Sequence, residues 1–273
     1  MANFCLGTAQ FGMQYGIANK TGKPDLNEIK KIINYSIQND VSYFDTAQSY
    51  GNSEIVLGDA LSNVEDLSKI RVISKLSPEI DLENLELIKK SVRSSIKKLN
   101  IDSLYGFLGH RFSAINNPSF RNALSILKED NLIMNSGVSV YTPEEALKSI
   151  GLDNVDIIQI PFNLFDRRWI DMDIFDIAIR NNVKIFIRSI FLQGVILMSE
   201  EELIRKNMKW AIKYLRQFNM LVAQTPYTTK EVAFGVLGFL PGEISIIMGI
   251  ETYNQLKQNI DLIKKSKFKK NFF

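Results

Sequence analysis

Eight short apolar runs recur along the chain, spaced so that a helix fits between each pair. The runs are rich in β-branched and aromatic residues, which favour extended structure. Each run has apolar residues on both faces, as expected for strands covered on both sides by other layers of the protein. We therefore predict eight buried parallel strands within residues 4–9, 42–47, 71–76, 104–110, 132–140, 155–162, 183–190 and 243–250.

The segments between these runs carry apolar residues three and four positions apart, the spacing that gives a helix one apolar face. This pattern predicts helices over residues 26–39, 83–99, 118–130, 143–150 and 201–218. Regular alternation of strand and helix, with no linker or low-complexity tract, predicts an α/β fold: a closed (β/α)8 TIM barrel formed as one domain by residues 1–273. The structural alternative is an open doubly wound sheet. The Gly-rich turn of such sheets is missing after the first run, where the sequence is GTAQFG.

Composition narrows the class of partner and the compartment. The chain has 33 basic and 30 acidic residues, and a net charge of +3 is too small to indicate nucleic acid or an anionic membrane as partner. No run reaches the length of a membrane span. The lone Cys5 and the absence of a secretory signal pattern predict a reducing cytoplasm. One histidine and one cysteine provide too few ligands for a zinc site, so we expect no metal.

Four polar side chains lie where predicted strands end. Asp45 and Tyr50 follow the second run, Lys75 ends the third and His110, the single histidine, ends the fourth. In a TIM barrel the carboxyl ends of the strands meet at one rim, where catalytic groups gather. Each residue taken singly has an ordinary structural explanation, such as a helix cap or a solvated lysine. Four at matching strand ends indicate a site.

These four side chains suit the reduction of a carbonyl group. When hydride attacks the carbonyl carbon, negative charge grows on the oxygen, which must then receive a proton. Tyr50 is the candidate donor. Lys75 would stabilise the phenolate, and Asp45 would hold the lysine charged and in place. His110 would orient the substrate oxygen.

Loops at the same rim carry aromatic rings and cations. Such a surface would suit an anionic or phosphorylated substrate, including a sugar or sugar nucleotide, although a solvated rim explains any single arginine slightly better. The expected partner is a small carbonyl or alcohol. The candidate substrate residues are Phe11, Tyr15, Arg111, Arg167 and Trp169.

The segment FDTAQSYGNSE at residues 44–54, continuing to Gly58, resembles the aldo-keto reductase signature D-T-A-x-x-Y-G-x-S-E-x-x-x-G. Lys75 and His110 fall where that family has its lysine and histidine. The resemblance extends from residue 6 to residue 259. It implies a TIM-barrel oxidoreductase that transfers hydride between a nicotinamide cofactor and a carbonyl or alcohol. Asp45, Tyr50, Lys75 and His110 would form its catalytic tetrad.

The resemblance also implies a dinucleotide site. Ser139 and Gln159 would bind the nicotinamide carboxamide, although the next residue, Val140, stands where many members have asparagine. Gln159 has an alternative explanation as a barrel-interior glutamine bonded to a neighbour. Arg188 would stack on the nicotinamide ring. The pyrophosphate loop would comprise Ser189, Phe191, Gln193 and Gly194.

The adenosine end would comprise Gly249, Glu251, Gln255 and Asn259. NADPH-selective members commonly place lysine or arginine just after the last strand, whereas this chain has Gly-Ile-Glu-Thr at residues 249–252. A carboxylate there would favour ribose hydroxyls over a phosphate, so the choice between NADH and NADPH stays open. Glu251 has an equally good explanation as a helix-start acid turned toward water.

Two other functions remain open. One is a low-turnover dinucleotide-binding sensor or partner subunit of the same superfamily. The other is a TIM-barrel lyase or isomerase that uses Lys75 as a base or Schiff-base nucleophile. The latter would leave the cofactor-like segments unexplained.

Overall fold

The computed structural model describes residues 3–265, and these form a closed barrel of eight parallel strands. The strands pair in chain order, and β8 closes the barrel against β1. Each strand coincides with one of the eight predicted runs, although β1 begins one residue earlier, at Asn3, so the strand prediction and the (β/α)8 fold class are confirmed. The strands are β1 (Asn3–Gly7), β2 (Tyr43–Asp45), β3 (Arg71–Lys75), β4 (Leu104–Gly109), β5 (Ile133–Ser139), β6 (Ile157–Pro161), β7 (Lys184–Arg188) and β8 (Ile244–Gly249).

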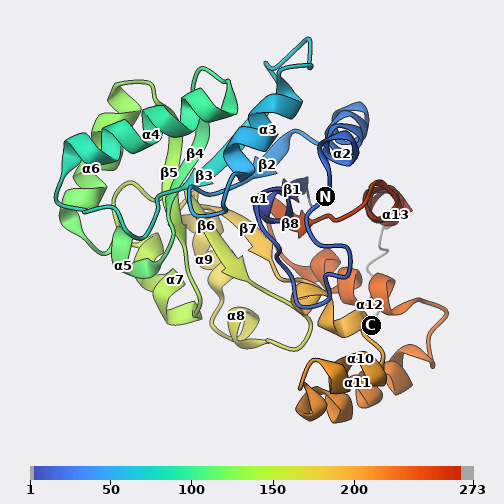
Figure 1. Ribbon diagram of the computed structural model, residues 1–273. Helices are drawn as coiled ribbons and strands as arrows, with labels where there is room; N and C mark the ends of the chain where they lie inside the picture. The colour runs from blue at the N-terminus through green and yellow to red at the C-terminus, as the bar shows by residue number, and fades with distance from the viewer. Residues whose placement is uncertain (1–2, 266–273) are drawn as a thin grey trace.

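Helices surround the barrel (Figure 1), and no helix within residues 3–265 is both long and apolar enough to cross a membrane. The α-helices are α1 (Ala9–Gly12), α2 (Leu26–Gln38), α3 (Ser53–Leu61), α4 (Leu85–Leu99), α5 (Phe112–Ile115), α6 (Pro118–Glu129), α7 (Pro143–Ile150), α8 (Arg168–Asp171), α9 (Ile174–Arg180), α10 (Glu200–Arg205), α11 (Lys209–Val222), α12 (Thr229–Gly235) and α13 (Tyr253–Lys265). Two 3-10 helices are η1 (Leu192–Leu197) and η2 (Val236–Phe239).

One predicted helix is wrong in its extent. Residues 201–218 form two helices, α10 and α11, rather than one. Asn207 between them has a φ of 57°, in the left-handed region that ends a helix. The apolar spacing continues across this break because both helices pack on the same small core, which includes Leu203 and Ala211.

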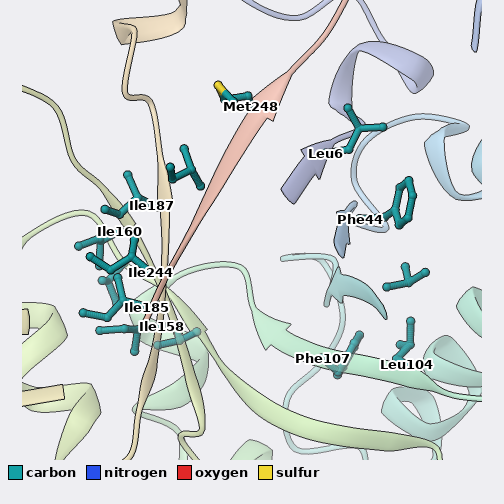
Figure 2. Close-up of a cluster of buried hydrophobic side chains, with 14 of the residues drawn as sticks. Leu6, Phe44, Leu104, Phe107, Ile158, Ile160, Ile185, Ile187, Ile244 and Met248 are labelled. Carbon is teal, nitrogen blue, oxygen red and sulfur yellow. The ribbon is translucent and has the colours of Figure 1, made fainter. Parts of the chain in front are cut away.

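Alternate strand residues face opposite sides of the barrel wall. Figure 2 shows part of the layer between strands and helices, to which Leu6, Phe44 and Ile158 contribute. A second set fills the barrel interior, with Cys5, Tyr43, Ile73, Tyr105, Leu108, Ile157, Phe186 and Ile247. A filled interior supports the rim rigidly, because packed side chains leave little room to shift.

Candidate active site

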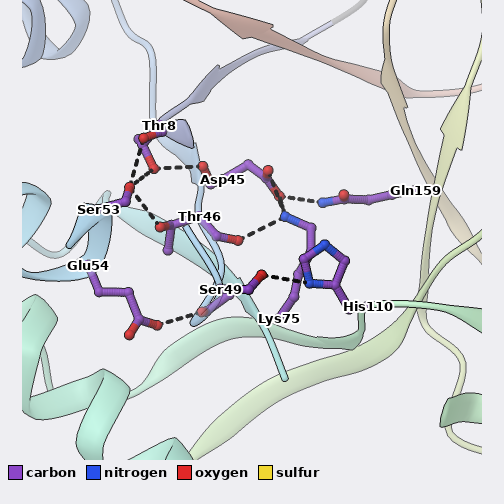
Figure 3. A network of polar contacts seen from close by, with 10 residues as sticks. Thr8, Asp45, Thr46, Ser49, Ser53, Glu54, Lys75, His110 and Gln159 are labelled. Carbon is purple, nitrogen blue, oxygen red and sulfur yellow. Dashed lines mark hydrogen bonds and ion pairs between the residues drawn. The ribbon is translucent and has the colours of Figure 1, made fainter. Parts of the chain in front are cut away.

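The predicted tetrad lies at the carboxyl ends of neighbouring strands. Asp45 and Lys75 are the last residues of β2 and β3, and His110 directly follows β4. The Lys75 ammonium lies 2.7 and 2.8 Å from the two carboxylate oxygens of Asp45 and donates a third hydrogen bond of 2.8 Å to the Thr46 carbonyl (Figure 3). All three donors of the ammonium therefore have partners, although the lysine is 1% exposed.

Tyr50 lies between the lysine and the histidine. The Lys75 Nζ atom is 5.0 Å from the centroid of the Tyr50 ring. The Tyr50 and His110 rings meet edge to face, with centroids 5.8 Å apart. Ser49 shares a 3.2 Å hydrogen bond with His110 Nδ1. The structure thus brings together the four side chains that the sequence indicated.

A tight backbone contact fixes the turn that carries Tyr50. A Cβ atom on Gly12 would lie 1.8 Å from the Tyr50 carbonyl oxygen, so only glycine lets α1 approach this closely. Behind the turn, the Ser53 hydroxyl bonds to the Thr8 carbonyl at 2.7 Å and accepts from Thr46 at 3.1 Å. These contacts tie the loop after β2 to the loop after β1.

Burial and charge act in opposite directions on Tyr50 and Lys75. Burial raises the pKa of Tyr50 above its usual value, and the positive charge of Lys75 offsets only part of this rise. The predicted effect of Lys75, stabilisation of the phenolate, agrees with the lowering contribution of its charge. The overall rise of the Tyr50 pKa was not predicted from the sequence. Burial alone would lower the pKa of Lys75, but Asp45 and Tyr50 outweigh it and the pKa is raised. Lys75 is therefore a permanent cation at neutral pH.

His110 is held neutral. Burial lowers its pKa to about 4, and the positive charges of Lys75, Arg111 and Arg188 add to the effect. A neutral imidazole carries one N–H. If Ser49 donates to Nδ1, the proton sits on Nε2, free to donate to a substrate oxygen.

Gln159 joins the tetrad directly. Its amide nitrogen donates to Asp45 Oδ1, and the side chain is completely buried. This is the interior glutamine of the alternative interpretation. Its amide oxygen is buried without a partner. Ser139 pairs with Gln159 across β5 and β6 and is 3% exposed. Neither residue lines the large cavity described next.

A cavity of about 300 Å³ runs from Asp45 and Tyr50 toward α13. Its wall comes from loops after β1, β7 and β8 and from α10, α12 and α13. Among the described wall residues, one buried side-chain polar atom lacks a partner: Oδ1 of Asn259, a residue that is 7% exposed. Of the eleven predicted cofactor residues, those in the wall are Arg188, Ser189, Phe191, Gln193, Gly194, Gly249, Glu251, Gln255 and Asn259.

Three of these side chains are already engaged, and the Gln255 amide oxygen accepts from the Glu251 N–H at 2.9 Å. Arg188 stacks on Tyr141, with the guanidinium carbon 4.5 Å from the ring centroid, and donates to the Val140 carbonyl at 3.1 Å. The Glu251 carboxylate accepts from the Thr21 hydroxyl at 3.3 Å. Glu251 therefore faces the loop after β1, an arrangement that neither sequence interpretation anticipated.

The predicted substrate residues separate into three groups. Tyr15 lines the cavity. Arg111 and Arg167 are exposed outside its wall, and Arg167 lies 3.6 Å from Asp171. The prediction that Phe11 and Trp169 contact substrate is wrong. Both are completely buried in the core, because the short helices α1 and α8 turn them inward. A side chain with no exposed surface has none to offer a substrate.

Three charged residues of the cavity wall carried no sequence signal. Lys20, in the loop after β1, forms an ion pair with Glu202 on α10. Lys230 enters from α12. None belongs to a recognisable motif, and only the fold brings their segments together. Within residues 3–265 no cluster of three or more His, Cys, Asp or Glu side chains is arranged to hold a metal.

The sequence profile of the Aldo/keto reductase family matches residues 3–273. This chain therefore belongs to the aldo/keto reductase family, and membership implies an oxidoreductase of that type. Among solved structures, the aldo-keto reductase AKR11C1 of Bacillus halodurans, in its holo form, is 18% identical. The match has a TM-score of 0.76 and covers 96% of this chain and 86% of that one.

A second structure, PA4992 from Pseudomonas aeruginosa, is 21% identical, with a TM-score of 0.71 over 96% of this chain and 89% of the other. At these identities the structural likeness shows the fold. A curated protein named "Probable aldo-keto reductase 1", from Glycine max, is 21% identical over 145 residues. That alignment covers 50% of this chain and 42% of the plant protein, less than half of its length.

Proposed function

We propose that this chain catalyses hydride transfer between a nicotinamide dinucleotide, NADH or NADPH, and a small carbonyl or alcohol, with Tyr50 as general acid and base. The observation that carries the proposal is the position of the phenol. Tyr50 lies at one end of the cavity, between a permanent cation and a neutral imidazole. Those are the groups needed where charge grows on a reacting oxygen.

The proton transfer follows from the charges around Tyr50. Burial keeps the phenol protonated at neutral pH, ready to donate to the substrate oxygen. The fixed Lys75 cation favours the phenolate that donation leaves behind. Asp45 holds the ammonium with both carboxylate oxygens. His110 donates its remaining N–H to the same substrate oxygen and so orients it.

The cavity fits a dinucleotide in its lining. The unpartnered oxygen of Asn259 would accept from the adenine amino group at one end of the cavity, and Asp45 and Tyr50 lie at the other. Between them, Ser189 and Gly194 would hold the pyrophosphate and Arg188 the nicotinamide face. The nicotinamide, when bound, supplies or accepts the hydride.

The lysine-dependent lyase or isomerase is disfavoured by the same geometry. A Schiff-base lysine must lose its proton to attack a carbonyl. Lys75 has a raised pKa and donates all three protons to fixed acceptors. The low-turnover sensor shares the dinucleotide site and differs in its rate alone.

Two measurements test the proposal. NADPH and NADH are titrated into the protein while nucleotide fluorescence is followed, and reduction of 4-nitrobenzaldehyde is then measured with the nucleotide that binds. In Tyr50→Phe we expect unchanged nucleotide affinity and a fall in reduction rate of about a hundredfold or more. Tyr35→Phe, on α2, is the matched control.

The outcomes separate the candidates. Full activity in Tyr50→Phe would remove the assigned proton donor. Tight nucleotide binding with negligible turnover on varied carbonyls would favour the sensor. If neither nucleotide binds but borohydride traps a substrate carbonyl on Lys75, the lyase or isomerase replaces the reductase.

A further inference from the structure

Lys230 is a cation of the cavity wall without an acidic partner. It is the second residue of α12 and is partly buried. Its ammonium donates to Oε1 of Gln258 at 3.4 Å, and within residues 3–265 no carboxylate lies within ion-pair distance of it. The other lysine of the cavity wall, Lys20, is already paired with Glu202.

The position of Lys230 relates it to the adenosine end of the cavity. Its partner Gln258 adjoins Asn259 on α13, whose buried oxygen faces no donor. Gln255, one turn earlier on α13, also lines the cavity. A buried acceptor without a partner costs free energy unless a ligand supplies a donor. An adenine amino group is such a donor, which places Lys230 beside the adenosine.

The loop after β8 does not provide a cation. Residues 249–252 contain none, and the carboxylate they do contain is held by Thr21 at 3.3 Å. Burial lowers the pKa of Lys230, so a nearby anion would stabilise its charged form. A lysine also carries its charge on a long flexible stem, which suits a phosphate at the end of a ligand.

We propose that Lys230 binds the 2′-phosphate of NADPH, so that a residue of α12 supplies the positive charge that the loop after β8 lacks. This inference rests on the proposed function and extends it, because it selects NADPH over NADH. The phosphate oxygen would accept from the ammonium in place of Gln258. The specificity of the site would then depend on the helix that precedes the last strand rather than on the loop that follows it.

The test compares nucleotides that differ by one phosphate. NADPH, NADH, 2′,5′-ADP and 5′-AMP are titrated by calorimetry into the wild type, Lys230→Met and Lys257→Met, the last an exposed lysine on α13 as matched control. We expect Lys230→Met to weaken NADPH and 2′,5′-ADP by about tenfold or more, as for loss of a charge-assisted bond. NADH and 5′-AMP should change by less than about twofold. Lys230→Arg should keep most of the preference, and Lys257→Met all of it.

Each other outcome overturns a distinct claim. An equal loss for NADH and NADPH would assign Lys230 to the pyrophosphate and refute the 2′-phosphate assignment. If Lys230→Met left the ratio of NADPH to NADH affinity unchanged, the 2′-phosphate assignment would be refuted too. The proposal of a reductase would still stand. Absence of nucleotide binding by the wild type would overturn the proposed function itself and this inference with it.

Discussion

Two lysine–carboxylate pairs lie at the cavity, and the pairs differ in almost every physical respect. In the Lys75–Asp45 pair the side chains are 2% and 6% exposed. In the Lys20–Glu202 pair they are 71% and 18% exposed. The first pair joins the last residues of two neighbouring strands, whereas the second joins the loop after β1 to α10. The first pair is therefore part of the barrel, and the second lies nearer the surface, with its lysine largely exposed.

Burial decides what each pair can do. In the interior a charge without its partner is very costly, so Asp45 helps to keep Lys75 charged, and both side chains stay at fixed positions. That constancy suits a proton transfer, which needs the same geometry at each turnover. An exposed ion pair contributes little to stability, and water or a ligand can easily replace the contact between its two side chains. The adenosine end, with Lys230 beside it, is thus where ligand preference can vary without disturbing the chemistry.

The strongest test of this contrast removes the buried ammonium. Lys75→Met should reduce the free energy of unfolding by about 3–5 kcal/mol, because Asp45 is left buried without its cation. Carbonyl reduction should fall as well, since Tyr50 loses the charge that favours its phenolate. Urea unfolding and steady-state rates measure the two effects.

A second substitution shows which part of that loss comes from the orphaned charge. In the double variant Asp45→Asn/Lys75→Met neither side chain is ionised, so much of the stability should return. Activity should stay low. If the double variant were as unstable as Lys75→Met, the loss would come from packing and the description of the pair as an electrostatic unit would be wrong.

An effect of intermediate size comes from His110, whose pKa is lowered to about 4 in the folded protein. An unfolded histidine titrates near pH 6.5. Below that pH the histidine is protonated in the unfolded chain but stays neutral in the folded protein. The free energy of unfolding therefore decreases as the pH falls. Between about pH 7 and pH 5 the loss should reach roughly 2 kcal/mol.

The chain has one histidine, so this pH dependence can be assigned to it. Urea unfolding curves at several pH values measure the dependence, and His110→Gln should remove it over that interval. A slope that survives in His110→Gln would mean that other groups cause it and that the imidazole is not held neutral.

Most of the fold could be predicted because the strands of a parallel barrel appear in the sequence as short apolar runs separated by amphipathic helices. The centre of a strand such as β7 is covered on both faces, so residues 185–187 are all apolar. The tetrad could be predicted for a related reason. Strand ends meet at one rim, so Asp45, Lys75 and His110 had to lie near one another once the strands were placed.

What could not be predicted depends on contacts between distant segments or on single dihedral angles. Nothing near Lys230 in the sequence shows that α12 lies beside Gln258. The bond from Gln159 to Asp45 crosses the barrel between β6 and β2. The break between α10 and α11 rests on the backbone of Asn207, which apolar spacing does not report.

The smallest effect is expected from a substitution that breaks the exposed Lys20–Glu202 pair, which tests the same comparison on the less buried pair. Glu202→Gln should leave the urea unfolding transition unchanged within error at both low and high salt, because water replaces the contact at little cost. It also releases Lys20, which lines the cavity, and should strengthen NADPH binding by no more than a few fold. The rate of reduction at saturating nucleotide should not change. A large loss of stability or of that rate would show that the Lys20–Glu202 pair holds the site together. The two ion pairs would then differ in position but not in their contribution to the site.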